Sequence, residues 1–199
     1  MEKNKNILIG GLLAIVLVMA VGYAAFATQL TINGNATITS NWDVHFDTTK
    51  TELVNGVVVG TPGLSGATAP TGTIVYQDSS NNSSNLHAKL NAKLTQPGDT
   101  VVFTLTILND GNLNAVLDSG PTLTLSGGTV SGLTATKGNI TFTVTTPGSI
   151  SAKNGNEPGS TTMTVTATFT EPGTGNYTTT ESATLDVNFT YKQAPAQQG

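Results

Sequence analysis

From residue 28 onward, apolar residues recur at every second position along most of the chain. A β-strand with one buried face has this period of two, whereas an amphipathic helix has a period of 3.6. The alternation therefore predicts a series of strands. The clear rows lie at 30–38, 42–46, 86–94, 101–107, 140–144, 163–169 and 185–191, and shorter strands are predicted at 53–59, 73–76, 122–125 and 129–133. The row at 101–107 is the most apolar, and Val102 and Leu108 on its second face favour a central position in a sheet.

Turn signals separate these rows. Five of the eight prolines precede Gly, and a Pro-Gly pair supplies the dihedral angles of a type II turn. We expect each of these pairs, which begin at 62, 97, 147, 158 and 172, to end a strand. Many short strands joined by turns, without crossover helices, are typical of an antiparallel β-sandwich of the jelly-roll or immunoglobulin kind. We therefore predict an all-β fold with one domain over 28–191 and a disordered tail over 192–199.

The first 27 residues differ from the rest of the chain. Lys3 and Lys5 precede an apolar run over 7–27, which ends in Ala25-Phe26-Ala27. Small residues at Ala25 and Ala27 form the pattern that signal peptidase cleaves, so we expect export and a mature chain that begins at Thr28. The apolar run is also long enough to span a bilayer, and an uncleaved membrane anchor is the alternative.

Composition excludes several classes of partner and site. The chain has 8 basic and 12 acidic residues and a net charge of −4, so it lacks the dense basic face that nucleic-acid binding requires. It has no Cys, which excludes disulfides and thiolate metal sites. We expect a secreted or cell-surface protein that contacts a membrane only through residues 7–27.

Three segments together resemble a known group of proteins. The export segment ends in Gly-Tyr-Ala-Ala-Phe-Ala over 22–27, the next strand reads Leu-Thr-Ile-Asn-Gly over 30–34, and Gln-Pro-Gly-Asp-Thr over 96–100 leads into the apolar row at 101–107. This resembles the TasA and camelysin group of Gram-positive surface proteins, which includes biofilm fibre subunits. The resemblance implies a jelly-roll-like sandwich that assembles by donating its N-terminal strand, here 28–39, to a neighbouring copy.

The clearest candidate for a chemical site is Asp43, His45 and Asp47, which alternate on one face of a predicted strand. Alternate residues lie about 6.6–6.8 Å apart along a strand, which is an awkward spacing around one metal ion. The other interpretation is a solvated outer face opposite Trp42 and Phe46, and we favour it because polar residues normally alternate outward in antiparallel sheets. We therefore predict three surface residues without a metal, and no cofactor. The minority alternative is a metal site, which in a hydrolase would use His45.

Other enzymatic motifs are missing from the sequence. It contains no His-Glu-x-x-His motif and no Gly-x-Ser-x-Gly nucleophile elbow, and its two His residues leave few bases to activate Ser or Thr. A Lys to Asn isopeptide crosslink would need a buried Lys, for which Lys89, Lys93 and Lys137 are the candidates.

The sequence thus favours a non-enzymatic extracellular structural protein, a fibre subunit whose partners are copies of itself. Strand addition combines backbone hydrogen bonds at a sheet edge with side chains that fill a groove. The groove-filling row would be Leu30, Ile32, Ala36 and Ile38. The alternative function is a monomeric adhesin or ligand-binding module, retained by residues 7–27, that makes contacts through the loop at 79–85.

Overall fold

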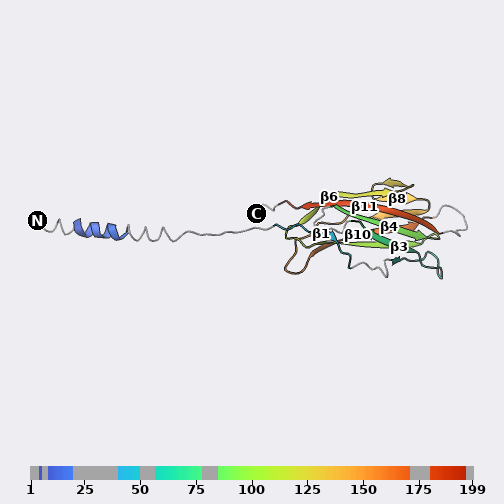
Figure 1. The fold of residues 1–199 in the computed structure, drawn as a ribbon, viewed down its shortest axis with the longest axis horizontal. Coiled ribbons are helices and arrows are strands. Elements are labelled where there is room, and N and C mark those ends of the chain that lie inside the picture. Colours follow the sequence, from blue (N-terminus) through green and yellow to red (C-terminus); the bar gives the residue numbers. More distant parts are fainter. Residues whose placement is uncertain are drawn as a thin grey trace. The chain divides into compact units, whose positions relative to one another are not determined.

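The structure of the chain is a computed structural model that describes residues 5, 9–19, 40–49, 57–77, 85–170 and 180–195 (Figure 1). The chain divides into two compact units, Met1–Thr39 and Ser40–Gly199. In the first unit, residues 9–19 form a helix with exposed side chains. Within the described residues, no helix combines the length and the apolar character needed to cross a membrane.

The second unit contains two antiparallel sheets packed on one core, which confirms the predicted all-β sandwich. Sheet A has six strands in the order β1 (Val44–Phe46), β5 (Thr100–Asn109), β10 (Gly159–Phe169), β9 (Ile140–Val144), β8 (Thr134–Lys137) and β7 (Thr129–Ser131). Sheet B has five strands in the order β2 (Val57–Val59), β3 (Thr71–Tyr76), β4 (Asn85–Leu94), β11 (Glu181–Gln193) and β6 (Ala115–Leu125).

Alternation along the strands forms the core. The apolar inward residues of β4, β5, β10 and β11 are at most 2% exposed, and together they join one apolar cluster between the sheets. Phe103 and Phe142 from sheet A and Phe189 from sheet B are among its largest members. Gly72 of β3 lies directly over Phe103, because a Cβ on Gly72 would approach that ring to 2.6 Å. The sheets are therefore packed too closely at this point for any side chain on Gly72.

Several strands differ from the sequence-based expectation, and three of them differ in ways that the sequence explains. β6 begins at Ala115 rather than at residue 122, and its pairing with β11 shifts register near Gly120 and Pro121, where the sequence resembles a turn. A Pro at a bulge of an edge strand removes no ladder hydrogen bond, which explains why β6 continues through it. β8 was not predicted as a separate strand. β11 includes Lys192 and Gln193, assigned above to the tail, because they pair with Val116 and Ala115.

The Pro-Gly pairs do not all form the same structure. Gly98 has φ 83° and the Asp99 N–H donates to the Gln96 carbonyl, as a type II turn requires. The glycines at 63, 148 and 159 do not have positive φ, and Gly159 begins β10 instead of ending a strand. The prediction that each pair ends a strand is therefore wrong at 158–159. The pair at 172–173 lies outside the described residues.

Candidate functional site

Among the described residues, β5 is only partly paired on the side that faces β1. Residues with even numbers on β5 direct their backbone groups away from β10, because neighbouring residues of a strand alternate in hydrogen-bond direction. Thr100 exchanges two backbone hydrogen bonds with Thr61, of 2.7 and 2.9 Å, and the Asp47 N–H donates to the Thr106 carbonyl at 2.9 Å. Between these flanks, Val102 and Thr104 have no backbone partner on this side within the described part of the chain. They leave a gap in the ladder at the edge of sheet A.

β1 leaves this gap because it is short. It pairs with β5 only over Val44 to Phe46, opposite residues 107–109. Beyond the hydrogen bond of Asp47, the next described pairing with β5 is the isolated bridge at Thr61. On the opposite side, the turn in which the Gly128 N–H donates to the Leu125 carbonyl joins β6 of sheet B directly to β7 of sheet A. The described chain therefore spans both sheets on the β6 and β7 side and leaves β5 partly uncovered on the β1 side.

A groove of about 290 Å³ lies at this open side, with β2, Gly60 and Thr61 on one wall and Thr100 and Val102 on the other. Its apolar side chains are unusually accessible, since Val59 is 66% and Val102 is 48% exposed. Small-molecule sites usually occupy about 300–1,000 Å³ and bury most of their ligand, so this groove lies just below their range. Its shape and its neighbouring free edge suit an extended peptide better.

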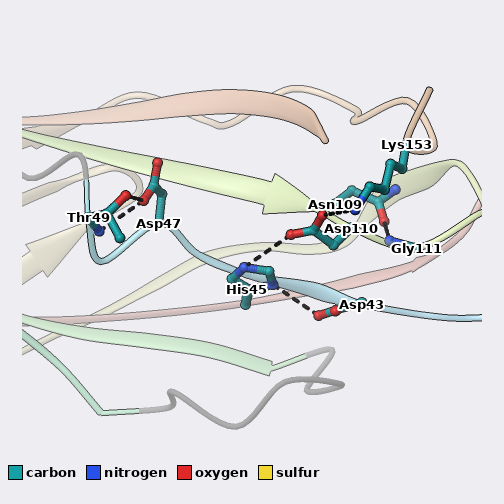
Figure 2. A network of polar contacts seen from close by, with 8 residues as sticks. All are labelled: Asp43, His45, Asp47, Thr49, Asn109, Asp110, Gly111 and Lys153. Atoms are coloured by element: carbon teal, nitrogen blue, oxygen red, sulfur yellow. Dashed lines mark hydrogen bonds and ion pairs between the residues drawn. The ribbon is translucent and has the colours of Figure 1, made fainter. Parts of the chain in front are cut away.

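The structure places Asp43, His45 and Asp47 in two separate surroundings (Figure 2). His45 Nδ1 lies 2.9 Å from Asp43 Oδ1, and His45 Nε2 lies 3.7 Å from Asp110 Oδ2. Lys153 Nζ lies 2.8 Å from the other oxygen of Asp110. These partly exposed polar groups form a continuous chain of contacts that ties β1 to two loops.

Asp47 does not belong to that chain. It is only 4% exposed, and its Oδ1 accepts hydrogen bonds from the Thr49 N–H at 2.9 Å and from the Thr49 hydroxyl at 2.6 Å. The prediction that Asp47 is a surface residue is therefore wrong. The physical reason is that β1 ends at Phe46, so the alternation that would turn residue 47 outward stops one residue earlier. Asp47 instead begins a turn and holds it with its carboxylate.

These surroundings do not assemble a metal site from the three residues. Among the described residues, no group of three or more His, Asp and Glu side chains is arranged to hold a metal ion. The loop that carries Asp110 is fixed by the buried Asn109, whose Nδ2 donates to the carbonyls of Leu113 and Ser151 and whose Oδ1 accepts from the Gly111 N–H (Figure 2). The network at His45 thus joins β1 to the loops that carry Asp110 and Lys153.

Some of the remaining residues predicted for crosslinking, strand donation and cleavage lie among the described residues, and others lie outside them. Lys89 is part-exposed and lies 3.8 Å from Asp186, Lys93 is exposed, and Lys137 is half-buried, so none is the fully buried Lys that an isopeptide crosslink requires. The donor row of Leu30, Ile32, Ala36 and Ile38 lies outside the described residues, as do Ala25 and Ala27 and nearly all of the loop at 79–85.

Sequence reasoning missed the groove residues Val59 and Val102. Val102 was noted as an apolar residue on the second face of its strand and interpreted as a sign of a central position. β5 is indeed flanked on both sides, but its neighbour β1 covers only one end. An apolar residue at an outward position is therefore the signal that could have identified the groove. The chain matches no family model, no curated protein and no solved structure.

Proposed function

We propose that the protein is a non-enzymatic extracellular subunit of a fibre, and that copies assemble by strand addition at the open side of the sandwich. An extended segment of one copy would pair with β5 of the next and place its side chains in the groove beside β2. The observation that supports this proposal is the gap at Val102 and Thr104, where up to four backbone groups have no partner among the described residues.

The features that normally protect a sheet edge are weak here. Natural edges are blunted by charged side chains, prolines or a covering segment. Neither outward residue of this gap, Val102 or Thr104, is charged. The valines of β2 form the wall of the groove that faces Val102. The stretch from Thr100 to Thr106 spans about 20 Å, which is the length of an ordinary strand. It can therefore pair with the centre of a donated segment while Thr61 and Asp47 mark its two ends.

The donor in this proposal is the segment 28–39 of another copy. Its apolar row of Leu30, Ile32, Ala36 and Ile38 carries the alternation that a groove-filling strand needs. Cleavage after Ala27 would free the segment only after export, which would keep assembly outside the cell. The resemblance to biofilm fibre subunits, stated above from sequence motifs, implies the same role for this segment.

Polymerisation of the purified secreted protein tests the proposal. We expect light scattering to rise over days and electron microscopy to show fibres. Val102→Lys would place a charge in the gap and stop assembly while leaving the fold intact, because Val102 is an outward residue. The matched control is Thr124→Lys on the exposed face of β6, which should assemble normally.

Deletion of residues 28–39 tests the donor separately. The shortened protein should remain monomeric, and a synthetic peptide of 28–39 should bind it and raise its melting temperature. A wild-type secreted protein that stays monomeric at high concentration over days would contradict the proposal. Normal fibres from the Val102→Lys variant would contradict the assignment of the acceptor edge.

A further inference from the structure

The outer face of sheet A carries a regular array of threonines. Every outward position of β10 from 162 to 168 is Thr, and so is every outward position of β9 and β8. On β5, the outward residues at 100, 104 and 106 are also Thr. We call these side chains on β5, β10, β9 and β8 the Thr lattice. All of them are at least partly exposed.

The strand registers align these threonines into rows that cross the sheet. In one row, Thr100 pairs with Thr168, Thr168 with Thr141, and Thr141 with Thr136. In the next row, Thr166 pairs with Thr143 and Thr143 with Thr134, while Val102 occupies the β5 position. The lattice therefore repeats in two directions, with about 4.7–4.9 Å between strands and about 6.6–6.8 Å along them.

Charge is distributed unequally between the two outer faces. On these four fully described strands, no outward side chain of sheet A is charged. The outer face of sheet B instead carries His87 and Lys89 next to Asp186, at 3.0 and 3.8 Å. Because Thr is abundant in the whole chain, its presence alone on a surface means little. On sheet A, the ionisable residues His45, Asp43 and Asp110 lie on and beside β1, and the four strands of the Thr lattice present only uncharged outward side chains, which needs a further explanation.

The lattice is also held in fixed positions. Thr has a branched Cβ and few side-chain rotamers. Hydroxyls on neighbouring strands contact one another, with 3.3 Å between the Oγ1 atoms of Thr136 and Thr141 and 3.0 Å between those of Thr145 and Thr164. The inward residues of the same strands are buried in the core, which anchors the sheet from below. A partner would therefore meet hydroxyl and methyl groups that are ordered before binding.

These properties exclude most kinds of partner. Nucleic acids and anionic lipids need basic residues, and a stable protein interface needs a buried apolar or aromatic centre. Sugar rings are normally held against flat aromatic side chains, and the outward residues of these four strands include none. A surface of regularly spaced hydroxyls and methyls instead suits a partner that is itself a neutral, periodic, hydrogen-bonding solid.

Ice has these properties and a similar spacing. With O···O hydrogen bonds of about 2.75 Å in tetrahedral geometry, second-neighbour oxygens in ice lie about 4.5 Å apart and the repeat along the hexagonal axis is about 7.3 Å. Both lengths agree with the spacings of the Thr lattice to within about a tenth. We propose that the Thr lattice is an ice-binding surface. The proposal does not use residues 28–39, and its rows share only Thr100 and Val102 of β5 with the groove, so the lattice on β10, β9 and β8 can be tested separately from fibre assembly.

Growth of ice crystals in a frozen sucrose film tests the proposal. We expect the purified protein to slow recrystallisation relative to an equal mass of albumin. Thr143→Lys with Thr166→Lys, which would put two charges into one row, should abolish this inhibition. Thr141→Lys with Thr168→Lys, which pair in the other row, should do the same. The matched control is Thr122→Lys on the exposed outer face of sheet B, which should inhibit as the wild type does.

Several outcomes would overturn the proposal. Wild-type protein that leaves crystal growth unchanged would do so, as would full inhibition by both double variants or loss of inhibition in the Thr122→Lys control. Melting curves of each variant establish that its sandwich is folded. Two further assays measure binding of the wild-type protein to insoluble cellulose or chitin and its dimerisation in analytical ultracentrifugation. If the wild type bound or dimerised but left ice growth unchanged, and the Thr143 and Thr166 substitutions abolished that binding or dimerisation, the face would be assigned to another partner. Fibre formation by these variants separates the result from the proposed function.

Discussion

Two tyrosines in the same aromatic cluster differ in what their hydroxyls contact. The ring centroid of Phe46 lies 4.6 Å from that of Tyr76 and 5.8 Å from that of Phe189. The ring centroids of Phe189 and Tyr191 are 6.1 Å apart. The Tyr191 hydroxyl donates to the Gly148 carbonyl at 2.7 Å. The Tyr76 hydroxyl is buried and has no hydrogen-bond partner among the described residues. A buried hydroxyl without a partner costs free energy, whereas a bonded one contributes to stability.

We expect Phe substitutions to separate these two cases. Tyr191→Phe should lower the free energy of unfolding by about 1 kcal/mol, because it removes a hydrogen bond and strands a carbonyl. Tyr76→Phe should leave stability unchanged or raise it, since it removes a buried polar atom and keeps the ring. Urea unfolding of the two variants beside wild type measures both effects. An equal decrease in the free energy of unfolding in both variants would show that the Tyr76 hydroxyl has a hydrogen-bond partner.

The same tyrosines should make the fold sensitive to alkali. Burial, followed by the charge of Asp47, raises the pKa of Tyr76 from 10.0 to about 12, and burial raises the pKa of Tyr191 to about 12. The unfolded chain loses these protons near its ordinary pKa, while the folded chain keeps them. Their contribution to stability is therefore complete below pH 10.0 and is lost as pH rises through about 12. Urea midpoints that do not fall faster in wild type than in a Y76F and Y191F double variant over this window would contradict the assignment.

At the scale of elements, one carboxylate organises the turn between β4 and β5. Asp99 is fully buried, and its oxygens accept hydrogen bonds from the N–H groups of Gly63, Thr95 and Gln96 at 2.9, 2.8 and 3.0 Å. The turn from Gln96 to Asp99 is thereby tied to the loop that follows β2. Gly63 packs against this turn so closely that a Cβ would lie 2.0 Å from the Pro97 carbonyl oxygen.

Asp99→Ala should therefore destabilise the protein strongly. It would leave three backbone donors without an acceptor, at a cost of about 3 kcal/mol or more. Asp118→Ala is the matched control. Asp118 forms an ion pair with Lys192 in which both side chains are about half exposed, so its loss should change stability by less than about 1 kcal/mol. Thermal melts of both variants provide the measurement, and similar melting temperatures would contradict the role given to Asp99.

The long strands could be predicted from sequence because each one shows the alternation of apolar and polar residues within its own segment. The alternating rows of β4, β5, β10 and β11 each extend over several residues, so the period of two is unambiguous. β7 and β8 are too short to display a period, and β6 contains a Gly-Pro pair that resembles a turn. Asp47 was placed on the wrong face because a single residue decides where β1 ends.

The groove and the Thr lattice could not be predicted because both depend on pairing between distant segments. The gap in β5 arises from the three-residue length of β1, which lies more than fifty residues earlier in the chain. Each Thr row depends on registers among four strands, and a shift of one residue in any of them would turn its threonines toward the core. Outward threonines are visible in the sequence, but their alignment is a property of the folded sheets.

At the scale of the whole molecule, the order of strands in space makes folding depend on the end of the chain. β11 lies between β4 and β6, and β10 lies between β5 and β9, although β10 and β11 are the last strands in sequence. Neither sheet can close before these strands are available. Pairing over such long sequence separations makes folding slow.

Removal of β11 should therefore abolish folding of the whole sandwich, and not merely remove one strand from a domain that still folds. Without residues 180–199, β4 and β6 have no strand between them, and the buried side chains of Leu185, Val187 and Phe189 leave the centre of the core. We expect this variant to show no cooperative thermal transition in circular dichroism and to lose near-ultraviolet signal. Removal of residues 196–199 alone is the control and should leave the transition unchanged, because β11 and the hydrogen bond from the Ala194 N–H to the Asn114 carbonyl remain. A cooperative transition in the longer truncation would mean that sheet B can close without its central strand, which its strand order does not allow.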